Sequence, residues 1–186
     1  MSKAFFDPVV PMLSTPDTPL PDAALSWYPL DQLPAGLQTG HELIDREHRT
    51  LLGCLDALRR LCIDLPGMTD CQSCSVERRH DCDQHLVSML GDLIAFILDH
   101  FQTEEKIMRD SLMVMLDRDV CEAHMEDHAN ISSKIQEIVM ALDPQRTVVR
   151  LRELENLIER WIENHIRLHD RLLVRWIELD PPLTAA

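Results

Sequence analysis

Histidine and carboxylate residues recur at helical spacing in four separate segments of this sequence, and in each segment they share a face with apolar residues. His100 and Glu104 are four residues apart, as are His124 and His128, so each pair lies on one face of a helix. An acid on a buried face needs a cation nearby, because an unpaired buried charge costs several kcal/mol. Four helices that direct such residues into one interior form a dinuclear metal site inside a bundle. The candidate ligands in these segments are His48, His100, Glu104, His124, His128 and His165.

The last of the four segments, W-I-E-N-H-I-R-L-H-D from Trp161, leaves two candidates for a further ligand. His169 is four residues after His165 and therefore has the regular helical spacing. Asp170 is five residues after His165 and needs a longer reach or a local π-type bulge to face inward. Spacing alone does not decide between them.

The remaining sequence predicts an all-α fold of one domain. Glycine is scarce, proline is scarce after the first forty residues, and runs rich in Leu, Ile, Met, Glu and Arg dominate. The short connections between the later helices favour an up-down-up-down four-helix bundle. Residues 111–118 could extend the second helix or form a loop packed on the end of the bundle. We expect helices from near Gly40 to Pro66–Gly67, from near Asp83 to about Met108, from about Val120 to Leu142, and from about Thr147 to Leu179.

The bundle is expected to occupy residues 39–180, between an arm at the N-terminus and a short tail at 181–186. Residues 1–38 hold seven of the eleven prolines, which predicts an extended arm. Trp27 and Tyr28 give this arm apolar side chains that we expect to pack on the bundle.

The charge of the chain limits its partners. With 32 acidic residues against 18 basic ones, the net charge is −14, which speaks against binding to nucleic acid or to an anionic membrane surface. No apolar run has the length of a membrane span, and residues 1–11 do not form a secretory signal. We therefore expect a cytoplasmic protein.

A cysteine-rich connection, at residues 68–85, separates the first two expected helices. Its candidate zinc ligands are one C-x-x-C pair, a histidine and a third cysteine, which would suit a tetrahedral site. A redox disulfide between two of the three cysteines, or simple loop thiols, are the alternatives, and Cys62 could be a further ligand. The four candidate ligands are Cys71, Cys74, His80 and Cys82.

The ligand segments resemble those of the hemerythrin family, especially bacterial hemerythrins and myohemerythrin. The resemblance covers roughly Gly40 to Leu179. Three features depart from the family pattern: the long arm, the enlarged cysteine-rich connection, and the longer gap between Glu104 and His124. The resemblance rests on I-D-R-E-H ending at His48, H-F-Q-T-E-E-K-I-M from His100, H-M-E-D-H from His124 and the segment from Trp161.

The resemblance implies a pair of iron ions and selects Asp170, not His169, as the seventh ligand. In such a centre Glu104 and Asp170 bridge the two irons together with an oxo or hydroxo group. One iron takes His124, His128 and His165. The other takes His48 and His100 and keeps one position for dioxygen. Apolar residues would line this position and exclude water, and Glu47 could orient a ligand histidine. The candidates for the lining are Ile44, Leu51, Phe101, Trp161 and Ile162.

The resulting prediction is a non-haem di-iron protein that binds dioxygen reversibly as a carrier, store or sensor, not an enzyme. The first alternative is a di-iron oxidase or peroxidase acting on peroxide or nitric oxide. Ferritin-like enzymes of this kind carry paired Glu-x-x-His motifs, whereas the one such motif here, Glu77 to His80, lies in the cysteine-rich connection. The second alternative is a redox or oxygen sensor that signals to a partner protein. The sequence identifies no such partner and is compatible with a monomer or a dimer.

Overall fold

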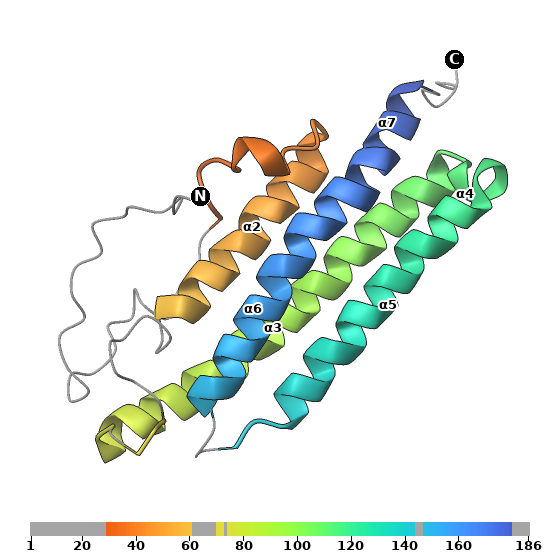
Figure 1. Cartoon of the computed structure of the whole chain (residues 1–186). Helices are drawn as coiled ribbons and strands as arrows, with labels where there is room; N and C mark the ends of the chain where they lie inside the picture. Colours follow the sequence, from red (N-terminus) through yellow and green to blue (C-terminus); the bar gives the residue numbers. More distant parts are fainter. Residues whose placement is uncertain (1–28, 61–69, 73, 144–146, 180–186) are drawn as a thin grey trace, which may run out of the picture.

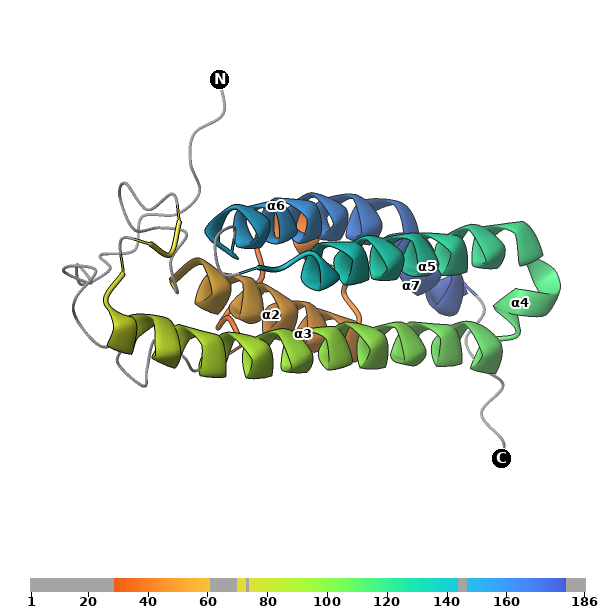
Figure 2. The ribbon, with the colours of Figure 1, turned by 90° about the horizontal axis from the view of Figure 1, so that it is seen from below.

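Four long helical rods run side by side and form the whole of the bundle (Figures 1 and 2). The structure is a computed structural model, and it describes residues 29–60, 70–72, 74–143 and 147–179. The short 3-10 turn η1 (Ala35–Leu37) precedes the first rod, and the short helix α4 (Met113–Leu116) joins the second rod to the third. The rods are α2 (Glu42–Leu58), α3 (Val76–Asp110), α5 (Arg118–Met140) and a continuous rod made of α6 (Thr147–His165), η3 (Ile166–Asp170) and α7 (Arg171–Leu179).

Each rod packs against two neighbours that run in the opposite direction. Helix α2 contacts α3 and α6, and α5 contacts the same two helices from the opposite corner. Figure 1 shows the chain reversing direction from α2 to α3, from α3 to α5 through α4, and from α5 to α6. The predicted all-α, up-down-up-down arrangement is therefore confirmed.

The core consists of two apolar clusters with a polar layer between them. The larger cluster fills the half of the bundle around Leu58, Leu93 and Leu154, whereas the smaller one, around Met108 and Leu173, lies toward α4 and α7. The predicted ligands occupy helical positions between the two sets, such as Glu104, which lies one turn before Met108. Each helix therefore buries an apolar stripe that a few polar residues interrupt at one level.

Helix α3 begins earlier than the sequence analysis expected, which corrects the predicted start near Asp83. It starts at Val76, because the Ser75 hydroxyl accepts a hydrogen bond from the backbone N–H of Arg78 at 3.2 Å and caps the helix. Much of the expected cysteine-rich connection is consequently helical. The predicted end of the first helix at Pro66–Gly67 lies outside the described residues. Residues 111–118, left open by the sequence, form a turn and the short helix α4, with Met113 buried against the end of the bundle.

The last rod contains a π-helical turn where the two ligand candidates compete. Residues Ile166–Asp170 form η3, and both Ile166 and Asp170 are buried. A π turn holds more residues than an α turn, so a residue five positions on returns to nearly the same face. Asp170 consequently points inward with His165, as the local bulge considered in the sequence analysis requires.

The described end of the N-terminal arm docks on the bundle beside α2 and α7. Leu33 and Leu37 are buried, and the backbone N–H of Leu30 donates to the carbonyl of Arg49 at 3.0 Å. Arg171 of α7 donates to the carbonyl of Gly36 at 2.9 Å. This part of the arm includes the 3-10 turn η1, so it is not wholly extended, whereas Trp27 and Tyr28 lie outside the described residues.

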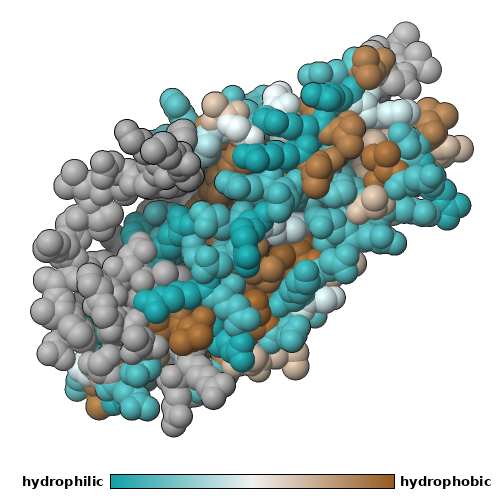
Figure 3. Space-filling view, viewed as in Figure 1, coloured by the Kyte–Doolittle hydropathy of each residue, from teal (hydrophilic) through white to brown (hydrophobic). Residues whose placement is uncertain are grey.

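Apolar side chains also reach the surface, and one group of them is at the end of the bundle where α4 and α7 lie (Figure 3). Leu112, Met115 and Leu179 are all exposed there. By length and composition alone, α3 is a described helix that could cross a membrane, which the sequence analysis did not anticipate. Core helices of bundles meet the same criterion, and α3 carries His100 and Glu104 toward the interior.

The π-helical turn can be tested by changing its length. Deleting the exposed Leu168 places Asp170 four positions after His165, so a regular α-helix keeps both residues on one face. We expect this variant to unfold at a temperature no lower than that of the parent protein. Inserting an alanine after Leu168 should instead rotate α7 by about 100° and expose Leu173 and Val174, at a cost of roughly 1.5–3 kcal/mol each.

Thermal unfolding followed by circular dichroism compares the parent, the deletion and the insertion. A deletion that destabilises the protein as much as the insertion would contradict this account of the turn.

Candidate metal centre

All seven predicted ligands meet in the polar layer of the bundle, and each is at most 3% exposed. They come from every rod: α2 supplies one, α3 and α5 supply two each, and the last rod supplies two. His169, the alternative candidate, is half-buried and lies at the edge of this layer. The described ligand atoms fall into two groups that share Glu104, and within each group they lie within 4.8 Å of one another.

The first group brings three imidazoles onto one carboxylate oxygen. Glu104 Oε2 lies 3.2 Å from His124 Nε2, 3.1 Å from His128 Nε2 and 3.4 Å from His165 Nε2. The three Nε2 atoms also converge, since His165 Nε2 lies 3.1 Å from that of His124 and 3.2 Å from that of His128. Nitrogen lone pairs that face one another at this distance are arranged as ligands around a common centre.

The second group contains two imidazoles and both carboxylates. His48 Nε2 lies 3.1 Å from Asp170 Oδ2, and His100 Nε2 lies 3.6 Å from Glu104 Oε1. The rings of His48 and His100 are 5.0 Å apart and nearly perpendicular. This half of the site therefore has one imidazole fewer than the first half.

Each carboxylate turns one oxygen to each half. Glu104 presents Oε2 to the three-histidine group and Oε1 to His100. Asp170 presents Oδ2 to His48, and its Oδ1 lies 3.0 Å from His165 Nε2 and 3.5 Å from His124 Nε2. Both acids are thus placed to bridge two cations.

Several of these buried atoms lack hydrogen bonds within the described part of the chain. They are His48 Nδ1 and Nε2, His100 Nε2, Glu104 Oε1 and both oxygens of Asp170. Buried polar atoms that lack partners are rare in native proteins, and here all but His48 Nδ1 point into the site. The donor set of imidazole and carboxylate, without thiolate, suits iron or another borderline cation. The residues present therefore fit a pair of metal ions.

Three further carboxylates hold the outer nitrogens of ligand histidines. Glu47 Oε2 lies 2.9 Å from His100 Nδ1, and Thr103 donates to its other oxygen at 3.1 Å. Glu105 Oε1 lies 3.4 Å from His128 Nδ1. Such contacts fix the tautomer so that Nε2 is free to bind a metal. The role considered for Glu47 in the sequence analysis is thus supported by a direct contact.

The third outer acid, Asp127, was not identified from the sequence. Its Oδ2 accepts hydrogen bonds from His165 Nδ1 at 2.7 Å and from Trp161 Nε1 at 2.6 Å. These partners lie on α6, 34 and 38 residues away, so no local spacing indicates them. The signal that could have suggested it is its place beside His128, in the H-M-E-D-H segment.

Neighbouring charged groups shift the pKa values of three buried side chains in the site. Burial would raise the pKa of Glu104, but His100 together with the three other imidazoles holds that pKa well below its usual value. Burial would lower the pKa of His165, yet Asp127 and Asp170 raise it well above the ordinary value. Glu104 and Glu47 likewise raise the pKa of His100 against the effect of burial. Protons therefore compete with metal ions at these two rings.

The five residues predicted to line the dioxygen position are all buried, but they surround different parts of the site. Phe101 stacks on His128 with ring centroids 3.8 Å apart, and Trp161 stacks on His165 at 4.6 Å, so both lie against the three-histidine group. Ile162 is one turn before His165 on α6. The remaining two, Ile44 and Leu51, are on α2 with His48, beside the two-histidine group.

The structure describes only part of the cysteine-rich segment. Cys71 and Cys74 form a turn in which the backbone N–H of Cys74 donates to the carbonyl of Cys71 at 3.3 Å, and His80 is exposed on α3. Among the residues the structure describes, the clusters of three or more ligand atoms contain histidine, aspartate and glutamate only. Cys62 lies outside the described residues. The zinc site at Cys71, Cys74, His80 and Cys82 stays a prediction.

Comparison with known proteins agrees with this geometry. A family model described as the hemerythrin HHE cation-binding domain matches residues 39–177, which include all seven ligands. No curated protein and no solved structure matches the chain. Because the match covers most of the chain and every converging side chain, the chain belongs to the hemerythrin family of cation-binding four-helix bundles.

Proposed function

We propose that this protein holds two iron ions and binds dioxygen reversibly, as a carrier, store or sensor. The observation that carries the proposal is the asymmetry of the site. Three imidazoles stand on one side of Glu104 and Asp170, and two stand on the other. A cation on the two-histidine side would have one protein ligand fewer and would have room for a small molecule.

The donor set and its oxygen bridges support a pair of iron ions in particular. Imidazole and carboxylate suit iron better than they suit a soft metal, and both acids present one oxygen to each half of the site. When bound, the iron pair supplies the electrons that dioxygen takes up on binding and returns on release.

The residues of the chain have three tasks in this function. Glu104, Asp170 and the five histidines bind the ions. Glu47, Glu105 and Asp127 orient three of the imidazoles through their Nδ1 atoms. Buried apolar side chains, including Ile44 and Leu51 on the two-histidine side, exclude water. Exclusion of water favours release of the gas unchanged over its reduction, because protons and solvent cannot reach it.

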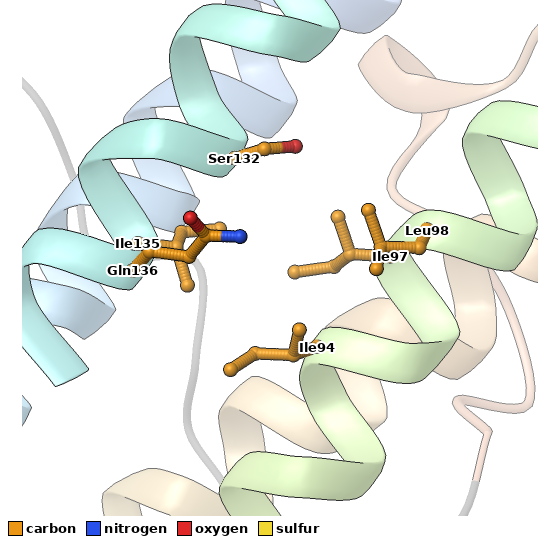
Figure 4. Close-up of a pocket in the computed structure, with 6 residues that line it drawn as sticks. All are labelled: Ile94, Ile97, Leu98, Ser132, Ile135 and Gln136. Carbon is orange, nitrogen blue, oxygen red and sulfur yellow. The ribbon is translucent and has the colours of Figure 1, made fainter. Parts of the chain in front are cut away.

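A small hollow lies between α3 and α5, and the proposed function would use it as the route of a small apolar molecule toward this layer. Figure 4 shows side chains of the two helices facing each other across the hollow, which is shallow and partly open to solvent. Ile97 lies one turn before His100 on α3, and the Ser132 hydroxyl donates to the carbonyl of His128 at 2.8 Å. The hollow is lined by Ile94, Ile97, Leu98, Ser132, Ile135 and Gln136.

The first test is reversible binding of the gas. Freshly purified protein should contain two iron ions per chain. After anaerobic reduction it should gain a visible absorption band on exposure to air and lose that band under argon. Replacing His48 by alanine removes a ligand from the two-histidine side and should abolish the band. Protein that binds no iron would refute the proposal, and sustained turnover of peroxide would favour the enzymatic alternative.

The second test concerns protons. Because the pKa values of His100 and His165 are raised in the protein, a metal ion must displace protons from these rings. Metal binding should therefore release protons and weaken as the pH falls from about 8 to about 6, and the weakening should begin above the ordinary histidine pKa of roughly 6.5, because both shifts are upward. Calorimetry in buffers of different ionisation heat measures the release. Affinity that is constant over this range would contradict the assignment.

The third test concerns access. Replacing the half-buried Ile94 by phenylalanine should fill the hollow and slow association of dioxygen roughly tenfold, the effect of raising a barrier by about 1.4 kcal/mol. The final spectrum should not change, because Ile94 does not contact the ligands. The matched control is Val87→Phe, at an exposed position of the same helix. Equal association rates for both variants in stopped-flow measurements would exclude this route.

A further inference from the structure

A third group of ligand atoms lies beside the metal centre, and the proposed function does not use it as a cation site. Asp127, His165 and His169 each offer one ligand atom, and these atoms lie within 4.8 Å of one another. Asp127 and His169 are half-buried, whereas His165 is buried. The group therefore extends from the buried layer toward the surface.

This position matters because the centre itself is closed. None of its seven ligands is more than 3% exposed, so a hydrated cation cannot meet them directly from solvent. It has to exchange its water for protein ligands in steps. The side chain of Asp127 is 34% exposed, and it can meet such an ion at the surface.

His165 connects the outer group with the centre. Its Nδ1 lies 2.7 Å from Asp127 Oδ2 on the outer side. Its Nε2 lies 3.0 Å from Asp170 Oδ1 and 3.4 Å from Glu104 Oε2 on the inner side. A single ring thus separates the outer carboxylate from the two bridging ones.

The other outer acids lack such a group. Glu47 is beside His100 and Glu105 is beside His128, but neither belongs to a described cluster of three ligand atoms outside the centre. Asp127 has a second imidazole within its group of ligand atoms. That imidazole is His169, whose ring lies 5.0 Å from the ring of His124 and 5.2 Å from that of His165.

We propose that Asp127, His165 and His169 form a loading site, which holds an incoming divalent iron ion before it passes inward to Glu104 and Asp170. Imidazole and carboxylate are suitable ligands for this ion. The ion exchanges water for protein ligands and its oxidation state does not change. The proton that His165 Nδ1 donates to Asp127 leaves to solvent while that nitrogen holds the ion, and it returns when the ion moves inward. This inference rests on the proposed function only in that the centre takes up iron.

The experiment measures uptake, independently of dioxygen. Metal-free protein is mixed anaerobically with ferrous iron, and a strong chelator added at intervals removes the iron that is not yet protected. For the parent protein, the rate at which iron becomes protected from the chelator should saturate as the iron concentration rises, because the ion binds the outer group before it moves inward. The His169→Gln variant should still protect two ions, but about tenfold more slowly. This is the expected effect if the loss of one ligand weakens binding of iron to the outer group about tenfold.

Two further variants separate a loading role from a structural one. His169→Glu restores a ligand that can bind ferrous iron and should recover most of the rate. His85→Gln, at an exposed histidine of α3, should behave like the parent protein. Parental uptake by His169→Gln, or a loss of its final iron content, would overturn the loading site.

The outcomes also separate this inference from the proposed function. If the parent protein protects no iron, both fall. If it protects iron with saturating kinetics but binds no dioxygen, the proposed function falls and the loading site stands.

Discussion

Two fully buried carboxylates are the constraint on which this structure depends. Glu104 and Asp170 are both 0% exposed, and ionised acids in such surroundings are costly unless cations compensate them. His100 and His165, whose pKa values are raised, supply that compensation as protonated rings, and metal ions would supply it with the five imidazoles as co-ligands. This explains why one layer of the core is polar on all four rods, while apolar clusters fill the bundle on both sides of it. A metal ion that enters the layer replaces protons and does not have to create a new cavity.

The π-helical turn shows how the helix accommodates that layer. A regular helix would bring His169 into line with His165 and rotate Asp170 away, so the layer would gain an imidazole and lose a carboxylate. The extra residue in the π turn Ile166–Asp170 turns Asp170, and not His169, toward the interior. It also leaves His169 at the edge of the layer, beside Asp127. A local departure from ideal geometry at a functional site is common, because the ligand requirement outweighs the small cost of the distorted turn.

The sequence was sufficient for the features that depend on local spacing. The pairs His100–Glu104 and His124–His128 share a face on any α-helix, so their convergence could be predicted. The start of α3 was placed wrongly because its main local signal is the cap at Ser75, within a segment whose cysteines suggested a loop. Asp127 was missed for a different reason: its partners are on another helix, and contacts between helices depend on packing that spacing does not encode. The same holds for the hollow between α3 and α5.

The outer acids also bear on the charge that the centre can hold. Glu47, Glu105 and Asp127 each lie against the Nδ1 atom of a ligand histidine. This contact makes the Nε2 atom of the same ring a stronger electron-pair donor to a metal ion. With Glu104 and Asp170, five carboxylates surround the two ligand groups, and this would favour a higher positive charge on ions bound there. Asp127 keeps its own charge, because His165 and Trp161 hold its pKa at about 2 despite partial burial. Under the proposed function, this negative surrounding would stabilise the more oxidised state of the bound ions, and the buried apolar side chains beside the ligands would keep solvent from making the electron transfer irreversible.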